Sequence, residues 1–165
     1  MPLRAVTNLA VTVMVSDTTL RAIGHVAAQW AYFETEFDIF LNQLLRHPKT
    51  KHLVSASMPQ AFDRRAALFR KCATILLKEH PKLLHQIVRI INDACSVRRH
   101  RDNVIHGQWH PGRRGTAVTV IRARPKFSAR ERHMSDPDIE EIAAQISVVT
   151  ARLIWWREMN VDYGG

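Results

Sequence analysis

The chain has 165 residues, of which 46% are hydrophobic and 24% charged, and a formal net charge of +9. The length predicts one domain, and the composition is typical of a globular protein with a single core. Charged residues interrupt every long apolar run, which excludes a membrane-spanning helix.

Residues 1–16 are interpreted as an N-terminal arm or a short strand, because LAVTVMV alternates and is rich in β-branched residues. The stretch has no strong apolar segment and no small-residue cleavage site, so we expect no signal peptide. Cys72 and Cys95 lie in apolar helical patterns and are expected to be reduced thiols. These features predict a cytoplasmic protein without membrane contact.

A first helix of about 28 residues is predicted after Ser16 and Asp17, which can both act as N-caps. It ends before His47-Pro48, because proline disfavours helical geometry in the residue before it. Its apolar positions recur at spacings of three and four. They are Leu20, Ile23, Ala27, Trp30, Phe33, Phe37, Phe40, Leu41 and Leu44.

A second helix is predicted from Pro59 to about Glu79, and a third from Pro81 to Ile105. Pro81 suits the first turn of a helix, and Gly107 suits the residue that ends one. The apolar faces again have helical spacing. They comprise Phe62, Ala66, Phe69, Ala73, Leu76 and Leu77 in the second helix, and Leu84, Ile87, Val88, Ile91, Ala94 and Cys95 in the third.

A β-hairpin is predicted after the third helix. A short strand beginning at Gln108 and a second strand, TAVTVIRA, flank a Pro-Gly-Arg-Arg-Gly turn. Lys126–Ser135 is expected to be a basic loop. Asp136 is predicted to cap the last helix, with Pro137 in its first turn. The core face of that helix is Ile139, Ile142, Ile146, Val149, Leu153 and Trp156, whereas Trp155 points elsewhere.

The expected fold is therefore mostly α, a four-helix bundle with a small β-hairpin between the third and fourth helices. Residues 17–160 are expected to form a single α-helical domain, followed by a tail at 161–165. A second tryptophan outside the core stripe, Trp155, hints at a dimer interface.

The positive charge is concentrated in one segment. Between Arg98 and Arg132 there are ten basic and two acidic residues, so this stretch carries +8 of the net +9. Cations held together repel one another unless a polyanion neutralises them, and arginine forks suit phosphate. We therefore expect a polyanion site in this segment, for which the candidate RNA-binding residues are Arg98, Arg99, Arg113, Arg114, Arg122 and Arg124. A solvated basic face is the alternative.

Arg101 and His106 form a candidate catalytic pair at the end of the third helix. RNA cleavage without a metal needs a base for the 2′-hydroxyl proton, an acid for the leaving oxygen and positive charge beside the phosphate. Histidine titrates near neutral pH, and arginine offers a permanently charged fork. We assign His106 as general acid or base and Arg101 as the phosphorane stabiliser. Asp102 and Asn103 support them, and no metal or cofactor is expected.

The spacing of the pair raises a geometric difficulty. Five residues at about 100° each place Arg101 and His106 roughly 140° apart around a regular helix. Asp102 and His106 would share a face, so Asp102 can hydrogen-bond the ring. A homodimer that brings two such helix ends together would complete a composite site. Structural alternatives remain: the helix dipole favours a C-terminal histidine by about 0.3–1 kcal/mol, Arg101 can pair with a carboxylate, and Asn103 can cap a turn.

The run RDNVIHG, from Arg101 to Gly107, resembles the Arg-polar-x-x-x-His motif of the HEPN superfamily (higher eukaryotes and prokaryotes nucleotide-binding). WAYFETEFDIFL is similar to the first long helix of small bacterial members. The resemblance extends over the layout of residues 18–160. It implies an α-helical bundle, commonly dimeric, and a metal-independent endoribonuclease with Arg101 and His106 at its site.

Many HEPN proteins are toxins or phage-defence effectors, so the resemblance also implies a cognate antitoxin as a partner. Other members have no nuclease activity, which leaves a non-catalytic module for nucleotide, RNA or protein as the alternative. A third reading is a DNA-binding protein that uses the basic hairpin.

Several other polar residues are weaker candidates. Glu34 falls on the apolar stripe of the first helix, and we favour an edge or structural role, such as half of an ion pair with an arginine, over a place at the site. His47 and His52 flank a polar loop that lacks a metal-ligand pattern. His110 and His133 are expected to be surface residues, with RNA contact as the alternative.

Overall fold

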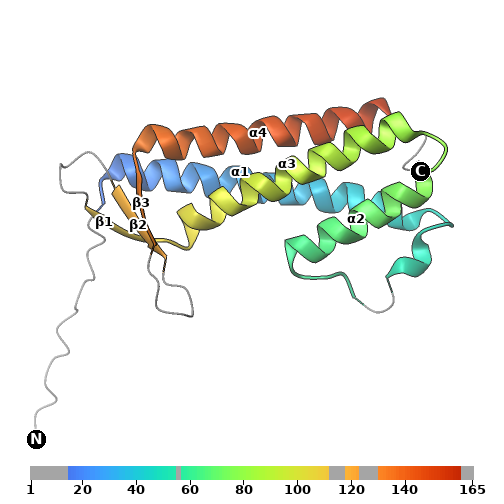
Figure 1. Cartoon of the computed structure of the whole chain (residues 1–165), viewed down its shortest axis with the longest axis horizontal. Helices are drawn as coiled ribbons and strands as arrows, with labels where there is room; N and C mark the ends of the chain where they lie inside the picture. Colours follow the sequence, from blue (N-terminus) through green and yellow to red (C-terminus); the bar gives the residue numbers. More distant parts are fainter. Residues whose placement is uncertain (1–14, 55–56, 112–117, 123–129, 161–165) are drawn as a thin grey trace, which may run out of the picture.

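The computed structural model describes residues 15–54, 57–111, 118–122 and 130–160, and within them the fold is mostly α (Figure 1). The predicted arm and tail therefore lie almost wholly outside the described residues. No described helix is long and apolar enough to cross a membrane. The helices are α1 (Asp17–Arg46), α2 (Phe62–Leu76), α3 (Pro81–Ile105) and α4 (Asp136–Met159), with a 3-10 turn η1 (Lys51–Leu53). The strands are β1 (Gln108–Pro111), β2 (Val118–Arg122) and β3 (Arg130–Met134).

The three long helices, α1, α3 and α4, lie side by side, with α2 toward one end and the strands at the other (Figure 1). Aromatic rings form the centre of the core. Seven of them each contact at least one other ring, at centroid distances between 5.0 and 5.9 Å. These rings are Trp30, Phe33, Phe37 and Phe40 of α1, Phe62 and Phe69 of α2, and Trp156 of α4. The other helices thus pack around the middle of α1.

Helix α1 has the ends that the sequence predicts. The side chain of Ser16 accepts a hydrogen bond from the backbone N–H of Thr19 (3.1 Å), which satisfies one of the free donors of the first turn. The helix ends at Arg46, and His47 is extended at φ −65° and ψ 137° before the proline. Its C-terminal half buries the predicted apolar residues from Trp30 to Leu44.

The prediction for the N-terminal half of α1 is wrong for Leu20 and Ala27, whereas Ile23 packs partly buried against the core. Leu20 is 45% exposed and Ala27 is exposed, whereas Ala22 and Val26 are buried. Both sets have helical spacing, so periodicity could not separate them. A polar residue fixes the rotation of the helix: buried Thr19 donates its hydroxyl to Asp136 of α4 (2.6 Å).

Helix α2 is shorter than predicted, since it begins at Phe62 rather than Pro59 and ends at Leu76 rather than near Glu79. Helix α3 has the predicted ends, Pro81 and Ile105. Its buried face differs in part from the prediction, because Leu84, Val88 and Cys95 are only half-buried. The additional core residues of α3 are Ile90, Val97 and Val104.

The strands form one antiparallel sheet in the order β1-β2-β3. The loop expected at Lys126–Ser135 is therefore wrong for Arg130–Met134, which is β3. The sequence RERHM is charged rather than β-branched, so pairing with β2 overrides a weak local preference. Met134 anchors the strand, since it is only 2% exposed. The predicted Pro-Gly-Arg-Arg-Gly turn begins at Pro111, which is instead the last residue of β1 and pairs with Val118, and the rest of the turn lies outside the described residues.

Ser135, not Asp136, caps helix α4. Its hydroxyl accepts from the backbone N–H of Asp138 (3.4 Å), while its own backbone N–H donates to the Asp138 carboxylate (2.8 Å). The backbone N–H of Ser135 and its hydroxyl (2.7 Å) both donate to the Asp138 carboxylate, and these two hydrogen bonds hold the pKa of Asp138 below its ordinary value. The carboxylate of Asp136 is used by Thr19 instead. All six predicted core residues of α4 are buried, and Trp155 is 61% exposed, as predicted.

Candidate active site at the end of helix α3

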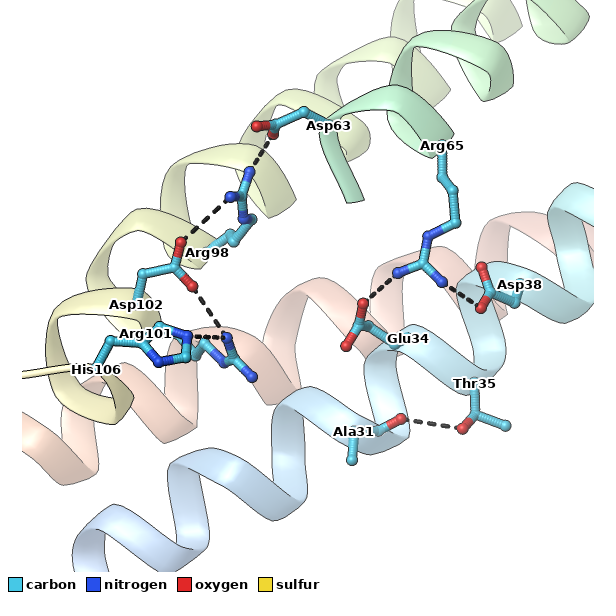
Figure 2. Close-up of polar contacts among 10 residues, drawn as sticks. All are labelled: Ala31, Glu34, Thr35, Asp38, Asp63, Arg65, Arg98, Arg101, Asp102 and His106. Carbon is cyan, nitrogen blue, oxygen red and sulfur yellow. Dashed lines mark hydrogen bonds and ion pairs between the residues drawn. The ribbon is translucent and has the colours of Figure 1, made fainter. Parts of the chain in front are cut away.

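Arg101 and His106 contact each other within one chain (Figure 2). Nη1 of Arg101 lies 3.5 Å from Nε2 of His106, at the outer limit of a hydrogen bond. The helix ends at Ile105, and His106 has φ −106° and ψ 3°, which turns its side chain off the helical path. Its backbone N–H still donates to the carbonyl of Asp102 (3.0 Å).

This geometry removes the difficulty that the spacing raised. The His106 Cα keeps its helical position, because its N–H closes the last helical hydrogen bond, but the φ of −106° changes the direction of its side chain. The long side chain of Arg101 spans the remaining separation. One copy of the chain therefore brings the pair together, and the geometric reason for a site shared between two copies falls away.

Asp102 holds Arg101 rather than the ring of His106. One carboxylate oxygen accepts from Nη1 of Arg101 (3.0 Å), and the other lies 3.3 Å from Nη2 of Arg98. The Asp102 side chain is only 14% exposed, so both contacts are partly shielded from water. The carboxylate thus bridges two guanidinium groups, one turn apart, at the end of α3.

Arg98 extends this network to α2, because its Nη1 pairs with the carboxylate of Asp63 in the first turn of that helix (Figure 2). The hydrogen bond to Asp63 raises the pKa of Arg98 above its ordinary value. Asp63 is 68% exposed, so this end of the network is open to solvent. The ion pairs run from Asp63 through Arg98 and Asp102 to Arg101, which contacts His106.

Arg101 also packs on α1, since its guanidinium carbon lies 5.6 Å from the centroid of the Trp30 ring. Its Nε is buried without a hydrogen-bond partner among the described residues. A cation held over an indole face gains about 0.5–2 kcal/mol, which offsets part of that loss. The guanidinium is therefore held from two helices before any ligand binds.

A second ion-pair cluster lies on the neighbouring part of α1 and α2 (Figure 2). Arg65 of α2 pairs with Glu34 and with Asp38 (2.7 Å) of α1. Burial raises the pKa of Asp38, although the Arg65 cation opposes the shift. Glu34 has the structural role favoured from the sequence, as one half of an ion pair with an arginine.

The other predicted RNA-binding and supporting residues are distributed more widely. Asn103 lies half-buried in the last turn of α3, and Arg99 is exposed one turn earlier. Arg122 belongs to β2, but its side chain is outside what the structure describes. Arg113, Arg114 and Arg124 lie outside the described residues altogether.

The remaining histidines do not assemble a metal site in the described part of the chain. No group of three or more His, Cys, Asp or Glu residues there could hold a metal ion. The ring of His47 accepts from the backbone N–H of Lys49 (3.1 Å), a local turn contact. His133 is exposed, as expected for a surface residue, and the side chain of His110 is not described. His52 is exposed as well.

Two contributors to the site, Trp30 and Asp63, were not predicted from the sequence. Trp30 was predicted only as a core residue. It is buried in the core, and the Arg101 guanidinium also packs over its ring. Asp63 gave no signal, because an ion pair between separate helices depends on their packing. The spacing of Arg98 and Asp102, four residues apart, was a usable signal for their pairing.

No protein-family model, curated protein or solved structure matches the chain.

Proposed function

We propose that the chain is a metal-independent endoribonuclease of HEPN type, with a HEPN-like arrangement of its helices. The observation that carries the proposal is the contact between Arg101 and His106 at 3.5 Å, on a helix end where His106 is exposed. A fixed cation beside an accessible imidazole supplies two of the groups that phosphodiester cleavage without a metal needs, the positive charge beside the phosphate and the base. RNA is the substrate and the principal partner.

In the proposed reaction, His106 takes the proton of a ribose 2′-hydroxyl. The 2′-oxygen bonds to phosphorus, the bond to the 5′-oxygen breaks, and the 5′-oxygen takes up a proton from water. The products are a 2′,3′-cyclic phosphate and a 5′-hydroxyl. Arg101 stabilises the extra negative charge on the phosphorane.

The contacts of Arg101 suit that role. Nη1 carries the contacts to Asp102 and His106, and no hydrogen bond among the described residues engages Nη2. A phosphate oxygen can therefore approach the guanidinium through Nη2. Asp102 and Trp30 act as positioning residues, since they fix the guanidinium without reaching the reacting atoms.

A cytoplasmic location belongs to the same proposal, and the free thiols of Cys72 and Cys95 agree with it. A toxin or defence role, with a cognate antitoxin, stays a prediction from the sequence resemblance.

The test is incubation of the purified chain with single-stranded RNA in the presence of EDTA. We expect cleavage that leaves 2′,3′-cyclic phosphate ends, loss of cleavage in His106→Ala, and a large loss in Arg101→Ala. His52→Ala is the matched control, because His52 is an exposed histidine away from the site.

Equal cleavage by His106→Ala and the unchanged chain would refute the catalytic role. Binding of RNA without cleavage by either protein would favour the non-catalytic module. Salt-sensitive binding of duplex DNA without cleavage would favour a DNA-binding protein.

A further inference from the structure

The start of α3 and the end of α4 lie at the same end of the molecule (Figure 1), and a groove runs between the two helices there. From α3 it is lined by His85, Gln86 and Arg89, and from α4 by Trp155. We call this feature the α3–α4 groove. At 1.5 Å per residue, Arg89 lies about 18 Å from Arg101 along the axis of α3. The groove is therefore separate from the candidate active site.

The polar side chains that α3 contributes to the groove are exposed and unengaged. Among the described residues, no hydrogen bond or ion pair holds His85, Gln86 or Arg89. Arg152 of α4 also lines the groove, but its guanidinium is paired with Asp93 (2.7 Å). None of the described residues that line the groove is acidic. The positive charge of Arg89 is thus left without a counter-charge inside the groove.

Trp155 places an indole beside these groups and is 61% exposed. A singly exposed aromatic side chain needs no explanation, but this one shares its groove with unengaged hydrogen-bond donors. Nucleobases stack on exposed aromatic rings, and an arginine fork binds phosphate oxygens. The amide of Gln86 offers both a donor and an acceptor, as the edge of a base does. The combination of ring, amide and cation suits a nucleotide better than a simple anion.

The size and the surroundings of the groove limit the length of the ligand. Its volume of about 260 Å³ is slightly below the roughly 300–1,000 Å³ of typical small-ligand sites, which suits one nucleotide unit. Beyond Arg152 the surface between the helices is lined by Asp93 and Glu141. Arg152 neutralises Asp93, so the exposed carboxylate of Glu141 sets the charge there and repels a phosphodiester strand.

We propose that the α3–α4 groove binds a single nucleotide unit, with its base stacked on Trp155 and its phosphate bound by Arg89 and His85. A free mononucleotide and the terminal nucleotide of an RNA strand present this same chemistry, and the test below separates them. The proposal uses no residue of the endoribonuclease proposal, so each can fail alone.

The test is isothermal titration calorimetry of the full chain at low ionic strength, because salt weakens phosphate contacts. The probes are the four ribonucleoside monophosphates, adenosine, inorganic phosphate, and a short 2′-O-methyl RNA with a terminal phosphate, which cannot be cleaved through its 2′-oxygen. We expect a monophosphate to bind more tightly than adenosine or inorganic phosphate, because the ring and the cations both contribute. A strand that binds more tightly than any monophosphate identifies RNA as the source, and the reverse order identifies the free nucleotide.

Two substitutions test the assigned contacts. Trp155→Ala is expected to raise the Kd of the nucleotide about 5-fold or more, the effect of losing one stacked base, and Trp155→Phe to recover most of that loss. Arg89→Ala is expected to raise the Kd about 10-fold or more, because it removes a charged contact to the phosphate. Tyr32→Ala and Arg21→Ala are the matched controls, since both residues are exposed on α1. Circular dichroism checks that all variants are folded.

Several results would overturn the proposal. One is the absence of binding by every monophosphate and by the strand at about 5 mM. Another is inorganic phosphate that binds as tightly as the nucleotides, since the base would then contribute nothing. A Kd that Trp155→Ala and Arg89→Ala leave unchanged, or that the two controls raise equally, would do the same. An affinity that falls as the chain concentration rises would show that a second copy covers Trp155 instead.

Discussion

Asp102 is the residue whose loss tests the ion-pair network most directly. The substitution Asp102→Asn keeps the volume of the side chain but removes the charge that bridges Arg98 and Arg101. Arg98 keeps its second carboxylate, Asp63, whereas Arg101 keeps none among the described residues. The two guanidinium groups then lie on one helix end with one carboxylate fewer between them.

The expected loss follows from the burial of the contacts. A hydrogen bond to a charged group contributes about 1.5–3 kcal/mol when shielded, and exposed ion pairs contribute about 0–1 kcal/mol. Asp102 is 14% exposed, and its partners Arg98 and Arg101 are 28% and 22% exposed. The amide oxygen of Asn can still accept one hydrogen bond. We expect a loss of roughly 2 kcal/mol, which lowers the Tm by about 4–8 °C for a chain of this length.

Urea unfolding at neutral pH, followed by circular dichroism, measures this loss. Asp63→Asn is the matched control, because it also removes one carboxylate from the network but acts at a side chain that is 68% exposed. Its expected cost is below about 1 kcal/mol. Equal losses in the two variants, or a larger loss in Asp63→Asn, would refute the argument that burial sets the strength of these contacts.

Three further predictions concern the fold. Ser135→Ala removes the cap of α4 and should lower the free energy of unfolding, measured in urea, by about 1 kcal/mol. Ser147→Ala is the control and should change that free energy little, because Ser147 is exposed in the middle of the helix. Phe37→Ala should cost about 3–5 kcal/mol, because Phe37 is fully buried among other aromatic rings; a loss below about 1 kcal/mol would contradict the packing. Burial raises the pKa of the Cys72 thiol to about 11, so this thiol should react little at neutral pH. Ellman's reagent should therefore modify only the half-exposed Cys95 in the native chain. In guanidinium it should modify both thiols.

Much of the helical architecture could be predicted, because strong local signals mark it. Prolines at positions 48 and 81 fix where α1 ends and α3 begins. The core face of α4 could also be predicted, since all six of its predicted residues, from Ile139 to Trp156, are buried. The rotation of the first half of α1 could not be predicted, because its small apolar residues fit two rotations and a hydrogen bond to a distant helix selects one.

The candidate site could be predicted in its residues but not in its geometry. The Arg-polar-x-x-x-His motif identified Arg101 and His106, and the excess of positive charge indicated the same end of α3. The contact between them depends on the φ of −106° at His106, which differs from the helical value that a helical wheel assumes. The contributions of Trp30 and Asp63 come from other helices, so they follow only from the packing.

The place where α3 stops also sets how the site tolerates insertions. A residue inserted between Arg101 and Ile105 would turn the helix end by about 100° and advance it by about 1.5 Å relative to Arg101. The imidazole would then leave the guanidinium, even though both side chains remained. An insertion after Gly107 would leave the pair intact, because the last helical hydrogen bond closes at His106. The helix thus fixes the number of residues between Arg101 and His106. The pair tolerates a change in chain length after Gly107 but not between Arg101 and His106.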